Sequence, residues 1–110
     1  MPSPKTAFIP KLSEAQFQQQ VIDLAQIYGY DLTYHPFDSR RSRAGWPDLV
    51  LANSARSRVL VRELKTDVGK VSTDQLEWLK VLQLSGINAG VWRPVDLRNG
   101  HIIKDLRGDE

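Results

Sequence analysis

The chain has 110 residues, of which 41% are hydrophobic and 25% charged, and its formal net charge is +2. This length supports one hydrophobic core, so we expect one domain at residues 13–110, preceded by a loose, proline-containing arm at 1–12. The absence of cysteine excludes disulfides and thiolate metal sites. No apolar run approaches the ~20 residues of a membrane-spanning helix, and we expect neither a secretion signal nor a membrane partner.

The first predicted element is a helix that begins after Ser13 and ends at Gly29. Ser13 and Gln16 have the spacing of a capping box, in which each side chain accepts a backbone N–H of the other residue. Apolar residues then recur at helical intervals along one stripe. They are Phe17, Val21, Leu24 and Tyr28.

Three strands are predicted next. Residues 30–35 alternate in polarity and form the first, and residues 37–46 form a polar loop. The second and third strands, 47–52 and 57–65, are separated by a short turn and therefore read as a hairpin.

A second helix is predicted from Ser72 to about residue 85, because Ser72 and Gln75 again have capping-box spacing. Residues 88–93 form a fourth strand, and the tail at 94–110 is compatible with a loop and either a short helix or a strand. The order α-β-β-β-α-β indicates an α/β fold, with a mixed four-stranded sheet flanked by helices.

Charged residues stand at the ends of two apolar strands, where packing does not explain them. Asp48 begins the second strand, and Glu63 and Lys65 share one face near the end of the third. If the strands form a hairpin, the two carboxylates converge and require a counter-charge. Oxygen ligands without His or Cys point to Mg²⁺ or Mn²⁺. A structural ion pair with Lys65 explains the pattern equally well.

Glu14 and Gln75 each have two readings. Glu14 lies one heptad before Val21, so its carboxylate either reaches the Asp48–Glu63 pair or only complements the helix dipole. Gln75 either closes the capping box alone or also projects toward Lys65.

Together these residues resemble the PD-(D/E)xK nuclease superfamily and, more narrowly, the virus-type replication-repair nuclease (VRR-Nuc) family. The resemblance rests on Glu14, on "GWPDL" at 45–49, on "ELK" at 63–65 and on "GKVSTDQLEWL" at 69–79. It covers about residues 14–94 and implies a restriction-endonuclease-like core.

The resemblance also implies roles for these residues in an endonuclease that hydrolyses phosphodiester bonds with Mg²⁺ or Mn²⁺. Asp48 and Glu63 would bind the metal together with the backbone carbonyl of Leu64, and Lys65 would orient or activate the attacking water. Glu14 would bind the metal directly or through water, and Gln75 would support the site. The implied catalytic set is Glu14, Asp48, Glu63, Lys65 and Gln75.

Positive charge gathers in residues 35–65, which sum to +4, whereas the remainder of the chain sums to −2. Such a region fits a polyanion partner, although a solvated basic face is at least as good an explanation of the cluster alone. The candidate phosphate contacts are Arg40, Arg41, Arg43, Arg56, Arg58 and Lys70. No base-reading element is evident, which favours selection of DNA by its structure.

Resemblance to the minimal, stand-alone members implies a Holliday junction resolvase that acts as a homodimer. The strand face that carries Leu60, Arg62 and Leu64 must be covered by a helix or by a second subunit. Two alternatives stay open: the same chemistry on flaps, free ends or RNA, and a non-catalytic nucleic-acid-binding module. We expect a cytoplasmic protein of a bacterial or phage-infected cell.

Overall fold

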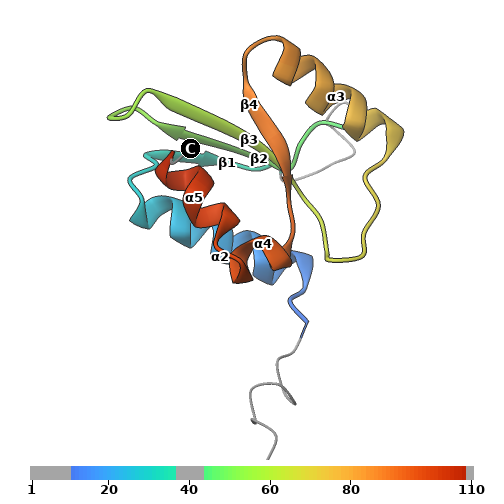
Figure 1. Ribbon diagram of the computed structural model, residues 1–110, viewed down its shortest axis with the longest axis horizontal. Helices are drawn as coiled ribbons and strands as arrows, with labels where there is room; N and C mark the ends of the chain where they lie inside the picture. Colours follow the sequence, from blue (N-terminus) through green and yellow to red (C-terminus); the bar gives the residue numbers. More distant parts are fainter. Residues whose placement is uncertain (1–10, 37–43, 109–110) are drawn as a thin grey trace, which may run out of the picture.

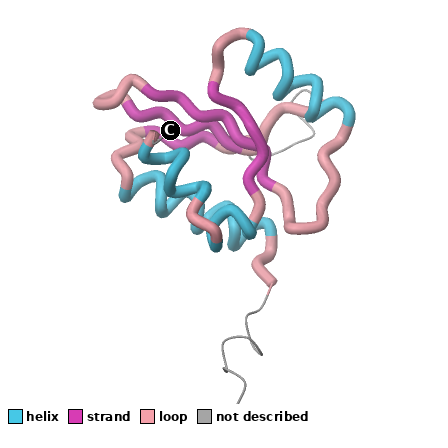
Figure 2. The backbone as a smooth tube through the Cα atoms, in the orientation of Figure 1, coloured by secondary structure: helices cyan, strands magenta, loops and turns pink. Residues whose placement is uncertain are grey.

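The computed structural model describes residues 11–36 and 44–108, which form one four-stranded sheet with helices on both faces (Figures 1 and 2). The strand order is β1-β2-β3-β4. The first three strands, β1 (Leu32–Tyr34), β2 (Leu49–Asn53) and β3 (Arg58–Leu64), pair antiparallel, and β4 (Asn88–Trp92) pairs parallel with β3. The predicted mixed sheet flanked by helices is therefore confirmed. No helix in the described ranges is both long and apolar enough to cross a bilayer.

Helix α2 (Glu14–Ile27) begins as the sequence predicts. Ser13 Oγ accepts the Gln16 N–H at 3.1 Å, and Gln16 Oε1 accepts the Ser13 N–H at 2.9 Å, which completes the capping box. The stripe that begins with Phe17 and Val21 is buried against the sheet. The helix ends before Gly29, whose φ of 89° suits a residue without a side chain.

The strands are slightly shorter than predicted. Tyr30 lies before β1 in the core, where its hydroxyl donates a hydrogen bond to the Leu106 carbonyl at 2.8 Å. Strand β2 begins at Leu49, because Pro47 has no N–H to give the sheet and Asp48 uses its side chain instead. At the other end of the hairpin, Ser57 has a φ of 54° and belongs to the turn.

Helix α3 (Thr73–Leu84) connects β3 to the parallel strand β4 and lies on the opposite face of the sheet from the other helices (Figure 1). The helix carries Leu76, Leu79, Val81, Leu82 and Leu84, of which only Leu79 is buried. Leu76 and Leu84 remain exposed. One side of α3 therefore presents apolar surface to solvent.

The tail folds into two short helices, α4 (Pro94–Arg98) and α5 (His101–Arg107). Ile102 and Leu106 are fully buried and join the core formed by α2 and the sheet. That core includes Leu60 and Leu64. The face for which the sequence left a helix or a second subunit open is thus covered by helices of this same chain.

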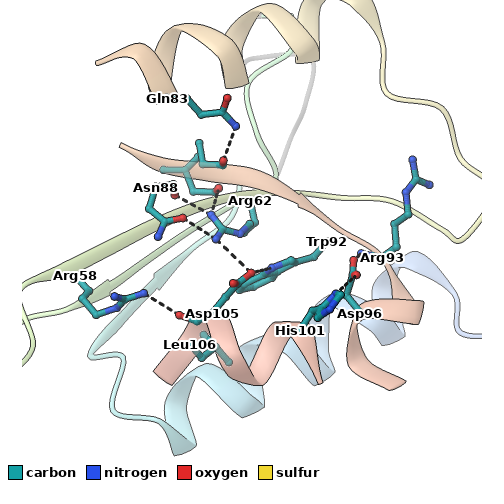
Figure 3. A network of polar contacts seen from close by, with 12 residues as sticks. Arg58, Arg62, Gln83, Asn88, Trp92, Arg93, Asp96, His101, Asp105 and Leu106 are labelled. Atoms are coloured by element: carbon teal, nitrogen blue, oxygen red, sulfur yellow. Dashed lines mark hydrogen bonds and ion pairs between the residues drawn. The ribbon is translucent and has the colours of Figure 1, made fainter. Parts of the chain in front are cut away.

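A polar network fixes α5 to the edge of the sheet (Figure 3). The guanidinium of Arg62, which is 4% exposed, lies over the Trp92 ring at 4.7 Å from its centroid. It donates to the backbone and side-chain oxygens of Asn88, both at 2.8 Å, and lies 3.6 Å from Asp105 Oδ2. The same carboxylate oxygen accepts the Trp92 Nε1–H at 2.9 Å. Burial lowers the pKa of Arg62, and Asp105 opposes that effect.

Candidate active site

Asp48 and Glu63 lie at the end of the β2–β3 hairpin nearest α3. Leu49 pairs with Arg62, so the register brings Asp48 beside Glu63 one step further along. Asp48 Oδ2 accepts a hydrogen bond from the Leu64 N–H at 2.8 Å. The hairpin that the sequence predicts therefore brings the two acidic residues together.

Glu63 is a buried carboxylate, only 2% exposed. Its Oε2 accepts from Gln75 Nε2 at 2.7 Å and lies 3.2 Å from Lys65 Nζ. Its Oε1 is buried and has no hydrogen-bond partner among the described residues. Burial, with the nearby charge of Asp48 adding to it, raises the pKa of Glu63 to about 7, although Lys65 acts in the opposite direction.

This donor set fits a hydrated divalent cation. A buried carboxylate oxygen without a partner is costly, and a bound cation would satisfy it. Mg²⁺ is commonly held by one or two carboxylates and keeps several waters, so Asp48 and Glu63 suffice for such a site. Within the described ranges there is no group of three or more acidic or histidine side chains that would form a fuller cage. Glu14 is exposed in the first turn of α2, and its part in metal binding stays a prediction.

Gln75 combines the two roles that the sequence left open. Its Oε1 accepts the Ser72 N–H at 2.8 Å and closes the capping box of α3, while its Nε2 donates to Glu63. Its side-chain partner is Glu63, whereas Lys65 was the partner in one of the two readings that the sequence left open. Helix α3 is thereby tied directly to the carboxylate pair.

Arg93 supports the other side of the site and was missed by the sequence analysis. Its guanidinium donates to the carbonyls of Thr66 at 2.6 Å and Gly69 at 2.7 Å, closing the loop that follows β3. A Cβ at Gly69 would lie 3.6 Å from Lys65 Cδ, so this loop passes close to the Lys65 side chain. No motif marks this contact in the sequence, because it joins residues more than twenty positions apart.

The loop that carries Asp48 is packed tightly against the start of α3. Gly45 has a φ of +85°, and a Cβ at this position would lie 2.5 Å from the Asp74 backbone carbon. Trp46 meets Trp78 edge-to-face, with ring centroids 5.0 Å apart, and Trp78 Nε1 donates to the Ala44 carbonyl at 3.0 Å. Trp46 thus has a packing contact, and no motif in the sequence marks the pairing of Trp46 with Trp78.

The structure describes three of the six predicted phosphate contacts, and these lie at both ends of the hairpin. Arg40, Arg41 and Arg43 lie outside the described residues. Arg56 and Arg58 lie at the far end of the hairpin from the carboxylates, and Arg58 donates to the Asp105 carbonyl at 2.8 Å, so it also helps to hold α5.

Lys70 is exposed in the loop that begins just after Lys65, at the same end of the hairpin as the carboxylates. The contacts of these basic residues with nucleic acid stay predictions.

Comparison with known proteins decides the family. The protein-family model described as the VRR-NUC domain matches residues 11–96. The chain belongs to the VRR-NUC domain family. The resemblance seen in the motifs is thereby confirmed, and the chain carries a nuclease-family domain. A solved structure described as a VRR_NUC domain protein is 22% identical, covers 80% of this chain and 83% of its own, and superposes with a TM-score of 0.63, which supports the fold.

Two curated relatives of this VRR-NUC domain are described as Fanconi-associated nuclease 1 homologs. The protein from Caenorhabditis elegans is 46% identical over 52 residues, which make up 47% of this chain and 6% of the relative. The protein from Caenorhabditis briggsae is 38% identical over 64 residues, 58% of this chain and 7% of the relative. The chain therefore spans less than a tenth of the length of these relatives.

Proposed function

We propose that this VRR-NUC domain is a metal-dependent endonuclease that hydrolyses phosphodiester bonds in branched DNA, with Holliday junctions as the leading substrate. The observation that carries the proposal is the convergence of Asp48, Glu63 and Lys65, in which one buried oxygen of Glu63 has no hydrogen-bond partner among the described residues. A purely structural ion pair leaves that oxygen unexplained. A cation against a phosphate explains it.

In this proposal Asp48, Glu63 and the Leu64 backbone carbonyl hold Mg²⁺ or Mn²⁺, with Glu14 contributing directly or through water. Such an ion, when bound, lowers the pKa of water and stabilises negative charge on a phosphoryl oxygen. Gln75 holds Oε2 of Glu63 in place and leaves Oε1 available. The backbone N–H of Leu64 orients Asp48 in the same way.

Lys65 supplies a positively charged hydrogen-bond donor at the candidate active site. Its ammonium group lies 3.2 Å from Glu63 Oε2, and its side chain is only 16% exposed, so the carboxylate positions it. A cation there orients water by hydrogen bonding and opposes the negative charge that develops on the phosphate.

The positions of the basic residues suit a substrate that extends well beyond one phosphate. The start of β3 lies five residues before Glu63, roughly 16 Å along the strand, and the Arg58 side chain there faces α5 on the other side of the sheet. Lys70 marks the active-site end of that span and Arg56 the other. Phosphate contacts at both ends fix the register of a nucleic acid without reading its sequence.

A homodimer is part of the proposal, and an exposed apolar patch supports it. Leu32, Tyr34 and Val59 are 71%, 58% and 47% exposed, and the strand register places them on the same face of the sheet as Glu63. Contiguous apolar surface of this kind marks a contact with another molecule. A second copy related by a two-fold axis would cover it and supply the second active site that symmetric junction cleavage needs.

Cleavage assays test the proposal. Wild type and Asp48→Asn are incubated with junction, flap, duplex and single-stranded DNA and with RNA, in Mg²⁺, in Mn²⁺ and in chelator. Asparagine retains an oxygen for the Leu64 N–H, so the variant isolates the loss of charge. We expect junction cleavage by wild type with metal only. If wild type prefers flaps, free ends or RNA, that nucleic acid is the substrate in place of the Holliday junction. If wild type cleaves nothing, the domain is a non-catalytic nucleic-acid-binding module.

Sedimentation tests the assembly in parallel. A dimer at micromolar concentration that cuts two strands of one junction supports the resolvase version. Tyr34→Lys places a charge in the apolar patch and is expected to yield monomers that nick one strand. A wild-type monomer that nicks only one strand contradicts this version of the proposal.

A further inference from the structure

A hollow of about 410 Å³ lies on one face of α3. Its lining consists of Ala44, Asp74, Glu77, Trp78 and Val81. The four residues from α3 follow helical spacing and so form one stripe of that helix. Asp74 is followed by Gln75, which bonds to Glu63, so one lining residue of the hollow is a chain neighbour of a residue that contacts the candidate active site.

The indole of Trp78 is fixed before any ligand arrives. Trp46 packs against it edge-to-face at an interplanar angle of 88°, and its Nε1–H is already bonded to the Ala44 carbonyl. The ring is only partly buried and contributes to the wall of the hollow, beside the exposed side chain of Val81. A rigid, partly exposed indole next to an aliphatic side chain is a stacking surface for a flat apolar ring.

The polar part of the lining restricts what such a ring can be. Asp74 and Glu77 are exposed, and neither carboxylate has a hydrogen-bond or ion-pair partner within the described residues. Two carboxylates repel a phosphate but accept hydrogen bonds from an amino group. A ligand with apolar faces and amino hydrogens on its edge satisfies both parts of the wall.

We propose that this hollow binds an unpaired nucleobase that carries an exocyclic amino group, such as cytosine or adenine, close to the phosphate that is cleaved. The base stacks on Trp78, and its amino group donates to Asp74 or Glu77. Thymine lacks that group and binds less well. The inference rests on the proposed function for the nature of the substrate, and it adds that the enzyme holds a base out of the helix next to the cut.

Binding without cleavage provides the first test. A DNA duplex with a single bulged nucleotide, either cytosine or an abasic residue, is titrated in chelator, and fluorescence anisotropy gives the Kd of wild type, Trp78→Leu and Leu84→Ala. Trp78→Leu is expected to raise the Kd for the cytosine bulge by about five-fold or more, and to leave the Kd for the abasic bulge unchanged. Leu84→Ala removes exposed apolar surface elsewhere on α3 and is expected to change neither Kd. Equal losses on both bulges would make Trp78 a packing residue and overturn the proposal.

A second pair of substrates tests the edge of the base and does not depend on replacing Trp78. Wild type is expected to bind a cytosine bulge more tightly than a thymine bulge by about five-fold or more. The double variant Asp74→Asn, Glu77→Gln loses most of this preference, because each amide can turn either a donor or an acceptor toward the base. Absence of the preference in wild type, or its survival in the double variant, overturns the proposal.

These measurements need no catalysis, so they test the base site independently of the proposed nuclease activity. If wild type cleaves DNA but shows no coupling between Trp78 and the base, the nuclease proposal stands and the base site does not. If wild type shows the coupling but cleaves nothing, the base site stands on a non-catalytic module.

Discussion

Gln75 Nε2 lies 2.7 Å from Glu63 Oε2, and the same glutamine closes the capping box of α3 through its Oε1. One side chain thus joins the start of a helix to the buried carboxylate that is the best candidate for a metal ligand. The candidate active site and the packing of α3 on the sheet therefore depend on one another.

Gln16 provides a control that separates the two roles of Gln75, because it has only the capping role. Gln16 closes the capping box of α2 in the same way and makes no contact with the carboxylate pair. We expect Gln16→Ala to lower the free energy of unfolding by about 0.5–1.5 kcal/mol, and Gln75→Ala to lower it further, because it also removes the hydrogen bond to buried Glu63. Only Gln75→Ala should also reduce DNA cleavage, by about tenfold or more. Urea denaturation and cleavage rates check this, and equal activities of the two variants would contradict the supporting role of Gln75.

Glu63 should make the stability of the metal-free protein fall as pH rises. The folded carboxyl has a pKa of about 7 against 4.5 for the ordinary value, so between these pH values the folded state binds more protons than the unfolded state. The free energy of unfolding therefore decreases through this window, and above it the contribution of Glu63 no longer changes with pH. Relative to wild type, Glu63→Gln should gain up to about 3 kcal/mol between pH 4.5 and 7.

Urea denaturation in chelator at pH 5, 6 and 8 measures this difference. Mg²⁺ at saturating concentration provides the matched condition, because a cation bound to Glu63 favours the ionised form and should stabilise wild type but not the glutamine variant at pH 8. A stability difference that is constant from pH 5 to pH 8 would show that burial does not raise the pKa of Glu63.

The sequence predicts those helices and strands that have strong local signals. It also predicts that the hairpin brings Asp48 and Glu63 together. Ser13 and Ser72 cap their helices as expected, because capping depends on residues three positions apart. Asp48 and Glu63 converge because a short turn fixes the strand register.

Contacts between distant segments leave no comparable pattern. Arg93 holds the carbonyls of Thr66 and Gly69, and Trp78 bonds to Ala44, yet none of these pairs is close in sequence. The tail was equally ambiguous, since the helical character of α5 comes from burying Ile102 and Leu106 against a core built by other elements.

Gly45 should be much less tolerant of substitution than Gly86, although both have positive φ. A Cβ at Gly45 would collide with the Asp74 backbone, whereas nothing lies within 4 Å of one at Gly86. Gly86→Ala is expected to cost about 1–2 kcal/mol from the backbone conformation alone. Gly45→Ala should cost more and also displace the loop that carries Asp48, so it should lower cleavage. Thermal denaturation and activity check the pair, and equal effects at the two glycines would contradict the packing of this loop on α3.

Asp105 should be more important to stability than an exposed ion-pairing residue, because it is the anionic partner of the buried Arg62 (Figure 3). Asp105→Ala removes that partner and also the acceptor of the Trp92 Nε1–H. Arg62 keeps its bonds to Asn88, and Asp105 is partly exposed, so we expect a loss of about 2–3 kcal/mol in the free energy of unfolding.

Arg98→Ala is the matched control for Asp105→Ala. It breaks the exposed pair with Asp67, and we expect it to cost less than about 1 kcal/mol. Urea denaturation of both variants, with the near-ultraviolet signal of the tryptophans as a second probe, measures the difference. If Asp105→Ala costs no more than Arg98→Ala, the stacking of Arg62 on Trp92 and its bonds to Asn88 are sufficient to keep the buried cation in place without a counter-ion.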